Sequence, residues 1–216
     1  LEIIDYIASK KKPVLLATGA SNIHEVHLAM DTIMKHTKDV VLMQCNTNYT
    51  ASLENFKYTN LNVLKEFKKL YPKVILGLSD HTPGHASVLG AITLGARVVE
   101  KHFTDDTYRE GPDHKFSMNY NTWKDMVNRS RELEYALGVC VKKVEDNEKE
   151  TVILQRRAIR AKTNLKEGSI ITIKDLDFLR PCPEDALSPH FTKKLLGVSL
   201  VRSVKAGESF LLSDID

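Results

Sequence analysis

Short apolar runs and longer helix-like segments alternate four times in the first 138 residues, and this alternation constrains the fold more than any other feature. The predicted strands start at four such runs: Pro13 to Ala17, Val40 to Met43, Val74 to Leu78 and the pair Val98-Val99. The intervening segments have apolar residues at the helical period, and the last predicted helix ends before Gly138. Four successive β-α units predict parallel strands joined by right-handed crossovers, and therefore an α/β fold.

A parallel sheet needs helices on both faces or closure into a barrel. Four units could make a small open sheet, or half of a TIM (β/α)8 barrel. Polar residues follow every predicted strand, as in barrel active sites. The start, Leu1 to Ile7, is typical of the middle of an amphipathic helix, and we expect that the chain lacks residues before Leu1. We therefore predict that residues 1–138 are the C-terminal half of a TIM barrel.

Residues 139–155 are predicted to be a linker. The stretch from Lys142 to Thr151 is highly charged and has no apolar period. Such a segment should be solvated and accessible to proteases, so we expect limited proteolysis to release a fragment that begins near Thr151.

Residues 156–216 have a different pattern, with short β-branched runs, turn residues and little helix. The segment Leu165 to Asp177 is echoed by Val204 to Asp216, and the glycines Gly168 and Gly207 occupy equivalent places 39 residues apart. Each copy is typical of a strand, a glycine turn, a second short strand and a capped turn. We predict a compact β-rich module.

Composition excludes several classes of function. The net charge is +3, and the basic residues are interspersed with acids without aromatic stacking partners, so a nucleic-acid partner is not expected. No apolar run approaches the ~20 residues of a membrane span, and the acidic start is unlike a signal peptide. Three widely spaced cysteines without a C-x-x-C pattern indicate a reducing, cytoplasmic setting.

Two histidines lie where neighbouring strands should end. His81 follows the third strand and His102 follows the fourth, so both imidazoles should emerge at the same edge of the sheet. With Asp80 and Glu100 beside them, they predict a divalent-metal site. The remaining six histidines lack this placement and are expected to be solvated: His24, His27, His36, His85, His114 and His190.

The segments around these histidines resemble the signature segments of the sialic acid synthase family. The similar segments are Leu76 to Thr82, Glu100 to Thr104 and Gly111 to Met118, together with Pro13 to Gly19, which is similar to the family's strand ending in Ser-Thr-Gly. Ala17 stands in place of the serine of that strand. Beyond the linker, Arg156-Arg157, the Lys-x-Gly turns and Arg180-Pro181 resemble the family's C-terminal antifreeze-like (SAF, β-clip) domain.

The resemblance implies a reaction, a cofactor and an assembly. The family condenses phosphoenolpyruvate with an N-acyl hexosamine, N-acetylmannosamine or a related diacetamido-sugar, to give a sialic-type (nonulosonic) acid and phosphate. It uses a divalent metal, commonly Mn²⁺, with Mg²⁺ or Co²⁺ as alternatives. Family members begin with a further half barrel, so this chain is expected to be inactive alone. The family also implies a homodimer with swapped modules.

The resemblance also implies roles for particular residues. His81 and His102 would hold the metal, with Glu100 and Asp113 as further catalytic residues. The side chains expected to bind substrate are Thr18, Thr47, Tyr49, Ser79 and Arg180. Arg180 would reach the active site of the other subunit and contact the acyl group of the sugar.

Each assignment has a plainer alternative. Glu100 could be a surface carboxylate, Asp113 a turn former, and Arg180 a surface arginine paired with Glu184 or Asp185. A different metal-dependent barrel enzyme, such as a hydrolase, and a carbohydrate- or ice-binding module on a barrel remnant are the alternative functions. The sequence does not determine which sugar is condensed.

Overall fold

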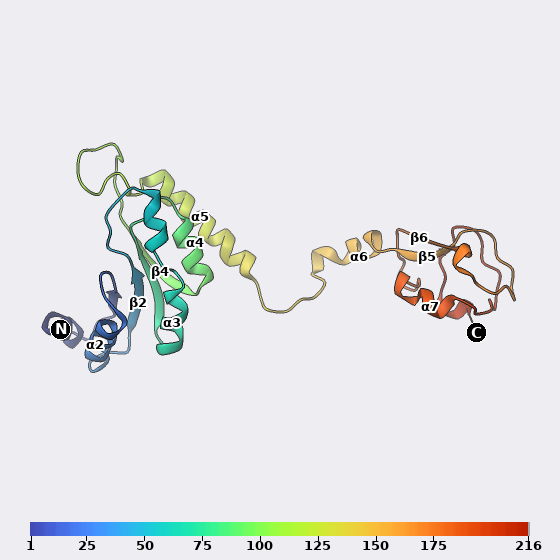
Figure 1. The fold of residues 1–216 in the computed structure, drawn as a ribbon, viewed down its shortest axis with the longest axis horizontal. Coiled ribbons are helices and arrows are strands. Elements are labelled where there is room, and N and C mark those ends of the chain that lie inside the picture. The colour runs from blue at the N-terminus through green and yellow to red at the C-terminus, as the bar shows by residue number, and fades with distance from the viewer. Residues whose placement is uncertain (216) are drawn as a thin grey trace. The chain divides into compact units, whose positions relative to one another are not determined.

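The structure is a computed structural model that describes residues 1–215. It divides into two compact units, Leu1–Val139 and the part of the chain from Cys140 onward, and each is described by itself (Figure 1). Within the described residues, no helix combines the length and the apolar character needed to cross a membrane.

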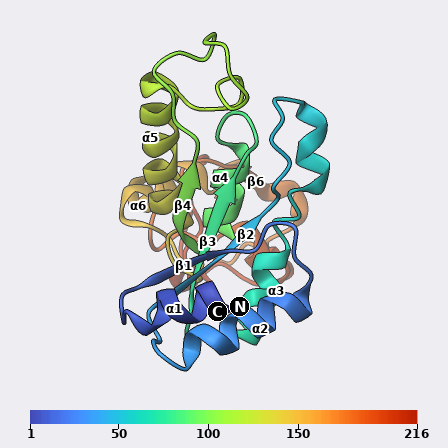
Figure 2. The ribbon, with the colours of Figure 1, turned by 90° about the vertical axis from the view of Figure 1, so that its left-hand side faces the viewer.

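The first unit contains a four-stranded parallel sheet in the order β1-β2-β3-β4 (Figure 2). Its strands are β1 (Val14–Ala17), β2 (Val40–Cys45), β3 (Ile75–Asp80) and β4 (Ala96–Lys101). Its helices are α1 (Glu2–Ser9), α2 (Ile23–Met34), η1 (Leu53–Tyr58), α3 (Val63–Leu70), α4 (Ala86–Thr93) and α5 (Tyr120–Leu137). The four predicted β-α units are confirmed.

Helix ends follow the local chemistry of the chain. Asn22 accepts hydrogen bonds from the first turn of α2, and the Glu25 carboxylate accepts one from the Asn22 N–H, which is a capping box. Asn119 caps α5 in the same way, and Gly138 ends α5 with a positive φ of 50°. The start of the first unit is helical, as expected.

Helices cover one face of the sheet. Leu42, Leu76 and Leu78 from this face pack with Met30 of α2 and Phe67 of α3 in the core of the unit. On the opposite face, which we call the inner face, the strand residues Leu15 and Ile75 are each 51% exposed. Cover on one face only is the arrangement of half a (β/α)8 barrel and differs from an open sheet with helices on both sides.

The pairing of β3 with β4 contains a β-bulge. Leu76 lies opposite Ala96, but Gly77 lies opposite Val98, so Arg97 is an extra residue in β4. Gly77 sits at this irregularity, where a Cβ atom would approach Met43 Cγ to 2.6 Å and the Val98 carbonyl oxygen to 3.0 Å. A side chain at Gly77 would therefore press on both neighbouring strands, β2 and β4.

The second unit is small and contains little regular structure. Its elements are η2 (Asp146–Glu148), α6 (Lys149–Gln155), β5 (Ala158–Ala161), η3 (Ile173–Asp175), β6 (Leu176–Leu179), η4 (Pro189–Phe191), α7 (Thr192–Leu195) and η5 (Leu212–Asp214). β5 and β6 are antiparallel, and isolated bridges hold the remaining extended segments together. The core residues with the least exposure are Ile159, Leu195 and Phe210.

The segment that we expected to be a linker carries helical structure in its second half. η2 and α6 occupy residues 146–155. Val152, Ile153 and Leu154 supply an apolar stretch for this helix, but it is short and follows a run of charged residues. Residues 138–145 are irregular and exposed. Only this shorter stretch has the character expected of a linker.

The echo in the sequence is a structural repeat. Leu165 and Val204, equivalent residues of the two copies, form a bridge with each other. Backbone hydrogen bonds recur after exchange of the copies: Lys162 N–H donates to the Asp175 carbonyl, and Val201 N–H donates to the Asp214 carbonyl. Adding 39 to both members of the first bond gives the second, so the module has an internal pseudo-two-fold symmetry.

Candidate active site

The bulge sets which residues of β3 and β4 lie side by side at their carboxyl ends. Ser79 lies opposite Glu100 and Asp80 opposite Lys101. Ser79 and Glu100 face the inner side, and Asp80 and Lys101 face the helices, because successive residues of a strand point to opposite sides. His81 and His102 follow directly, and their ring centroids are 5.1 Å apart. The structure thus brings the two predicted histidines together.

Two further aromatic rings complete a cluster with the histidines. The Tyr49 ring centroid lies 4.4 Å from that of His81 and 5.6 Å from that of His102. Phe116 packs on both imidazoles, at 6.2 Å and 5.1 Å. The predicted substrate residue Tyr49 therefore lies at the histidines. It is next to Phe116, an apolar residue of the site that the sequence did not indicate.

A backbone carbonyl fixes the tautomer of His81. His81 Nδ1 is 2.9 Å from the Asn46 carbonyl oxygen. A carbonyl oxygen only accepts, so Nδ1 carries the proton and Nε2 keeps its lone pair. Burial lowers the pKa of His81, which keeps the ring neutral. A neutral imidazole with a free Nε2 is the form that binds a metal.

The two predicted catalytic carboxylates, Asp113 and Glu100, lie close to the histidines or to their neighbours. Asp113 Oδ2 is 3.6 Å from His102 Nδ1, a distance for an ion pair and slightly long for a hydrogen bond. Ser79 donates from Oγ to Glu100 Oε1 at 2.8 Å. The predicted substrate residue Ser79 is thus bonded to the predicted catalytic carboxylate, and Glu100 is itself exposed.

The donor set fits a divalent metal in part. Each imidazole turns Nδ1 toward an oxygen acceptor, as metal-bound histidines usually do, which leaves both Nε2 atoms available. Among residues 1–215 there is no group of three or more histidine, cysteine, aspartate or glutamate side chains that could hold an ion. This chain therefore offers two imidazole ligands, and the remaining positions would need water, substrate or other residues.

Asp80 does not join the metal site that we expected beside it. It faces the helices and forms a buried ion pair with Lys101, at 2.8 Å. The alternation of side chains along β3 explains this, since Asp80 lies between the inward residues Ser79 and His81.

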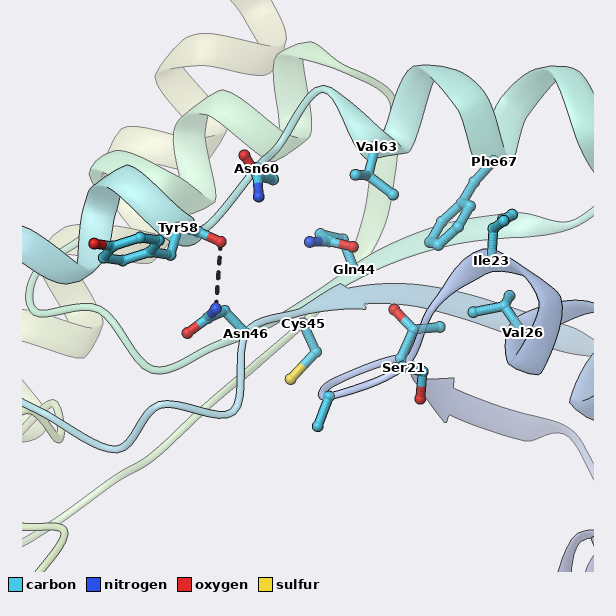
Figure 3. A pocket seen from close by; sticks show the side chains of 12 residues that line it. Ser21, Ile23, Val26, Gln44, Cys45, Asn46, Tyr58, Asn60, Val63 and Phe67 are labelled. Atoms are coloured by element: carbon cyan, nitrogen blue, oxygen red, sulfur yellow. Dashed lines mark hydrogen bonds between the residues drawn. The ribbon is translucent and has the colours of Figure 1, made fainter.

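Two more of the predicted substrate-binding residues, Thr18 and Thr47, lie in different environments. Thr18 is buried on the helix side, where its Oγ1 donates to the Met43 carbonyl. It lines a cavity of about 400 Å³ between the ends of β1 and β2 and the starts of α2 and α3 (Figure 3). Cys45 and Asn46 also line this cavity and contact His81, so it adjoins the histidine cluster. Thr47 is exposed beside Gly19.

Arg180 belongs to the second unit, where it is exposed and donates from Nε to the Gln155 carbonyl at 2.6 Å. The alternative partners Glu184 and Asp185 form no ion pair with it in the described part of the chain. Its guanidinium is held by the backbone, next to the end of α6.

Sequence reasoning missed several residues around the site. Cys45 contacts His81, with Sγ 4.0 Å from Nδ1, and burial raises the pKa of its thiol. Its signal was the alternation along β2, which extends two residues beyond the predicted end. His114 is half-buried and bonds Thr104 Oγ1 at 2.7 Å, and His27 is half-buried against the Tyr71 hydroxyl. Those two histidines are bonded, and the expectation that they are simply solvated was wrong.

Two protein-family models match the chain. The NeuB family model matches residues 1–142, and the SAF domain model matches residues 156–216. This chain belongs to the NeuB family. The resemblance in the signature segments is thereby confirmed.

Curated relatives are similar over almost all of the chain. N,N'-diacetyllegionaminic acid synthase of Legionella pneumophila is 34% identical over 218 residues, which is 99% of this chain and 60% of the relative. Pseudaminic acid synthase of Campylobacter jejuni is 33% identical over 213 residues, 96% of this chain and 59% of the relative. The chain thus spans about three fifths of the length of these nonulosonic acid synthases.

Solved structures show the same fold. A spore coat polysaccharide biosynthesis protein of Bacillus subtilis superposes with a TM-score of 0.58 at 29% identity, covering 100% of this chain and 64% of that protein. A truncated 3-deoxy-D-arabino-heptulosonate 7-phosphate synthase of Thermotoga maritima, at 21% identity, superposes with a TM-score of 0.53 over 65% of this chain and 56% of that one. At that identity the second likeness concerns the fold alone.

Proposed function

We propose that the protein carrying this chain is a nonulosonic acid synthase, which condenses phosphoenolpyruvate with an N-acyl hexosamine and releases phosphate. The observation that carries the proposal is the pairing of His81 with His102 beside the Ser79–Glu100 hydrogen bond, at the carboxyl ends of β3 and β4 in a NeuB-family chain. Substrate sites of (β/α)8 barrels lie at this end of the strands.

The reaction joins C3 of phosphoenolpyruvate to the aldehyde carbon of the open-chain sugar. The aldehyde oxygen gains a proton, water adds at C2, and phosphate leaves with its bridging oxygen as the 2-keto group forms. A divalent ion on His81 and His102 would supply Lewis-acid polarisation of the sugar carbonyl. Mn²⁺ is the ion we propose, although imidazole ligands also suit other divalent metals.

The residues of this chain would orient the substrates and move protons. Glu100, held by Ser79 and exposed to the inner face, would accept a proton from a substrate hydroxyl or from the attacking water. Asp113 would hold the His102 ring through Nδ1. Thr47 and Tyr49 are exposed residues, and their hydroxyl groups would bind the anionic substrate.

Other parts of the site would come from outside this unit. We propose that the N-terminal portion present in the relatives supplies the rest of the barrel, and that Arg180 of a second subunit binds the acyl group of the sugar. A planar guanidinium gives fixed donors to an amide carbonyl. We also propose a reducing, cytoplasmic setting, consistent with the three free cysteines of the described chain.

The test is phosphate release from phosphoenolpyruvate by the chain joined to the N-terminal portion that its relatives have. N-acetylmannosamine and a 2,4-diacetamido hexose are supplied in turn, with and without Mn²⁺. We expect release that needs both sugar and metal. Activity should fall more than 100-fold in His81→Ala and in His102→Ala, since losing a metal ligand costs more than losing a residue that only orients one. His85→Ala is the control, because His85 lies outside the cluster, beside Asp125.

Phosphate release that does not depend on the sugar, or that persists in both histidine variants, would show that this site does not perform the condensation. Circular dichroism of each variant separates loss of activity from loss of folding.

A further inference from the structure

A fully buried ion pair lies at the ends of β3 and β4, and nothing in the proposed reaction uses it. Lys101 Nζ is 2.8 Å from Asp80 Oδ2, and each side chain is only 1% exposed. Burying two charges is costly unless both are bonded on all sides, so an isolated pair of this kind needs a reason.

Every polar atom of the pair has a partner. Lys101 Nζ also donates to the Thr82 carbonyl at 2.6 Å. Thr82 donates from its backbone N–H and from Oγ1 to Asp80 Oδ1, at 3.0 and 2.8 Å. The Thr82 hydroxyl lies 3.0 Å from Ser87 Oγ in the first turn of α4. The network therefore joins β3, β4, the loop after β3 and α4.

The position of the pair relates it to the histidines. Asp80 precedes His81 in the chain, and Lys101 precedes His102. The ladder of β3 and β4 ends at the pairing of Asp80 with Lys101. The histidines thus lie one residue beyond the last ladder pair, where no backbone pairing between the strands fixes their separation. The ion pair is the last cross-link before them.

We propose that Lys101 and Asp80 are positioning residues that hold the imidazoles of His81 and His102 as a pair on the inner face. The ion pair acts from the opposite side of the sheet, through the backbone at residues 80–81 and 101–102. An apolar pair of the same volume would fill the space without fixing the register, whereas bonded charges specify one arrangement. The proposal rests on the proposed function only in so far as the paired rings bind a metal.

The test compares Lys101→Met, which removes the charge, with Lys101→Arg, which keeps it. Ile33→Ala is the control for stability alone, because Ile33 is fully buried in α2 and distant in sequence from the site. Each chain is examined by long-range ¹H–¹⁵N spectra of the histidine rings and by the nuclear Overhauser effect between His81 and His102.

In the unchanged chain we expect His81 as the Nδ1–H tautomer and a cross-peak between the two rings. Lys101→Met should lose both signals, Lys101→Arg should keep them, and Ile33→Ala should keep them although it lowers the unfolding midpoint. Mn²⁺ affinity, measured by electron paramagnetic resonance, should fall 10- to 100-fold in Lys101→Met, as for other residues that act through a ligand.

A Lys101→Met chain that is destabilised like Ile33→Ala but keeps the tautomer and the cross-peak would overturn the proposal, since the pair would then serve stability alone. If Lys101→Met does not fold, the double variant Asp80→Asn, Lys101→Gln removes both charges together and is read in the same way. If the unchanged chain shows paired rings but binds no Mn²⁺, the proposed metal site fails while the positioning role stands.

Discussion

At the scale of single residues, charged side chains in the second unit are held by several bonds at once. Arg202 donates to Asp214, which is fully buried, and to Glu208 Oε1 at 2.8 Å. The Glu208 carboxylate also accepts the Lys205 N–H. These bonds lower the pKa of Glu208, with the Lys205 N–H as the larger cause and the Arg202 guanidinium next.

The lowered pKa predicts how this unit responds to acid. A folded-state pKa below the unfolded value adds stability above about pH 4.3, and that stability is lost as the pH falls through the folded pKa. Glu208→Gln should reduce the loss of stability in acid, and should cost up to about 1 kcal/mol near pH 7 because the group is partly exposed. The measurement is hydrogen exchange of the Phe210 amide between pH 7 and pH 3.5.

The control is Glu184→Gln, since Glu184 is an exposed carboxylate of the same unit. Equal acid sensitivity of Glu208→Gln and the unchanged chain would contradict the assignment. The same bonding pattern lowers the pKa of Asp175 through Thr172, so some acid sensitivity should remain in the variant.

At the scale of elements, β3 packs so closely between β2 and β4 at Gly77 that a side chain there has no space. A Cβ at Gly77 would press on Met43 and on the Val98 carbonyl, and the backbone cannot yield as a side chain can. Gly77→Ala should therefore lower the free energy of unfolding by about 1–3 kcal/mol, as overpacking does. Chemical denaturation measures this.

Gly90→Ala is the matched control. A Cβ at Gly90 would meet only the far end of the Leu61 side chain, and alanine favours the interior of α4 by about 1 kcal/mol over glycine. We expect little change or a slight gain. A Gly77→Ala chain as stable as Gly90→Ala would mean that the bulge tolerates a side chain on its neighbour.

The elements also show what could be predicted from the sequence. Strands, helices and the two histidines at strand ends follow from local apolar patterns, and Asn22 is a strong capping signal. The bulge at Arg97 has no local signal, because it arises from pairing between strands. Without that register, the ion pair between Asp80 and Lys101 cannot be predicted from the sequence either. α6 is short and follows charged residues, so its pattern was too brief to identify.

At the scale of the whole molecule, the connection between the units is shorter than the predicted linker. Residues 138–145 are irregular and exposed, whereas α6 begins at Lys149. We expect limited trypsin digestion to cut after Lys142 or Lys143, which moves the fragment start from the neighbourhood of Thr151 toward residue 143. Mass spectrometry of the early fragments identifies the site.

Resistance of residues 138–145 to trypsin, with cleavage first inside either unit, would contradict this expectation. The double variant Lys142→Gln, Lys143→Gln is the control, since it lacks the two trypsin sites and should survive digestion longer.

If Arg180 of a second subunit binds the sugar, as we propose, each site depends on both subunits of a dimer. Full-length protein with Arg180→Ala should bind the sugar more weakly while keeping its affinity for phosphoenolpyruvate. Mixing Arg180→Ala with His81→Ala should restore activity at about a quarter of all sites, since half of the dimers are mixed and one site in each is intact. Phosphate release after subunit exchange is the measurement.

Confirmed subunit exchange without any recovery of activity would rule out an arginine supplied by the partner. The pair Arg157→Ala with His81→Ala is the control, because Arg157 bonds the Phe178 carbonyl within its own unit.

Beyond the bulge, the number of residues in β4 decides which side chains lie on the inner face. Losing one residue of β4 after the bulge, such as Val99, would shift each later residue by one pairing, so that Lys101 would come opposite Ser79 on the inner face and His102 would come opposite Asp80 and face the helix layer. A single lost codon here would thus exchange an imidazole for an ammonium group while leaving the composition of the strand almost unchanged. In the loop at residues 105–112, side chains do not alternate between two faces, so a change in length does not reverse them. Among natural homologues, we expect insertions and deletions to accumulate in that loop and to be absent between residues 98 and 102.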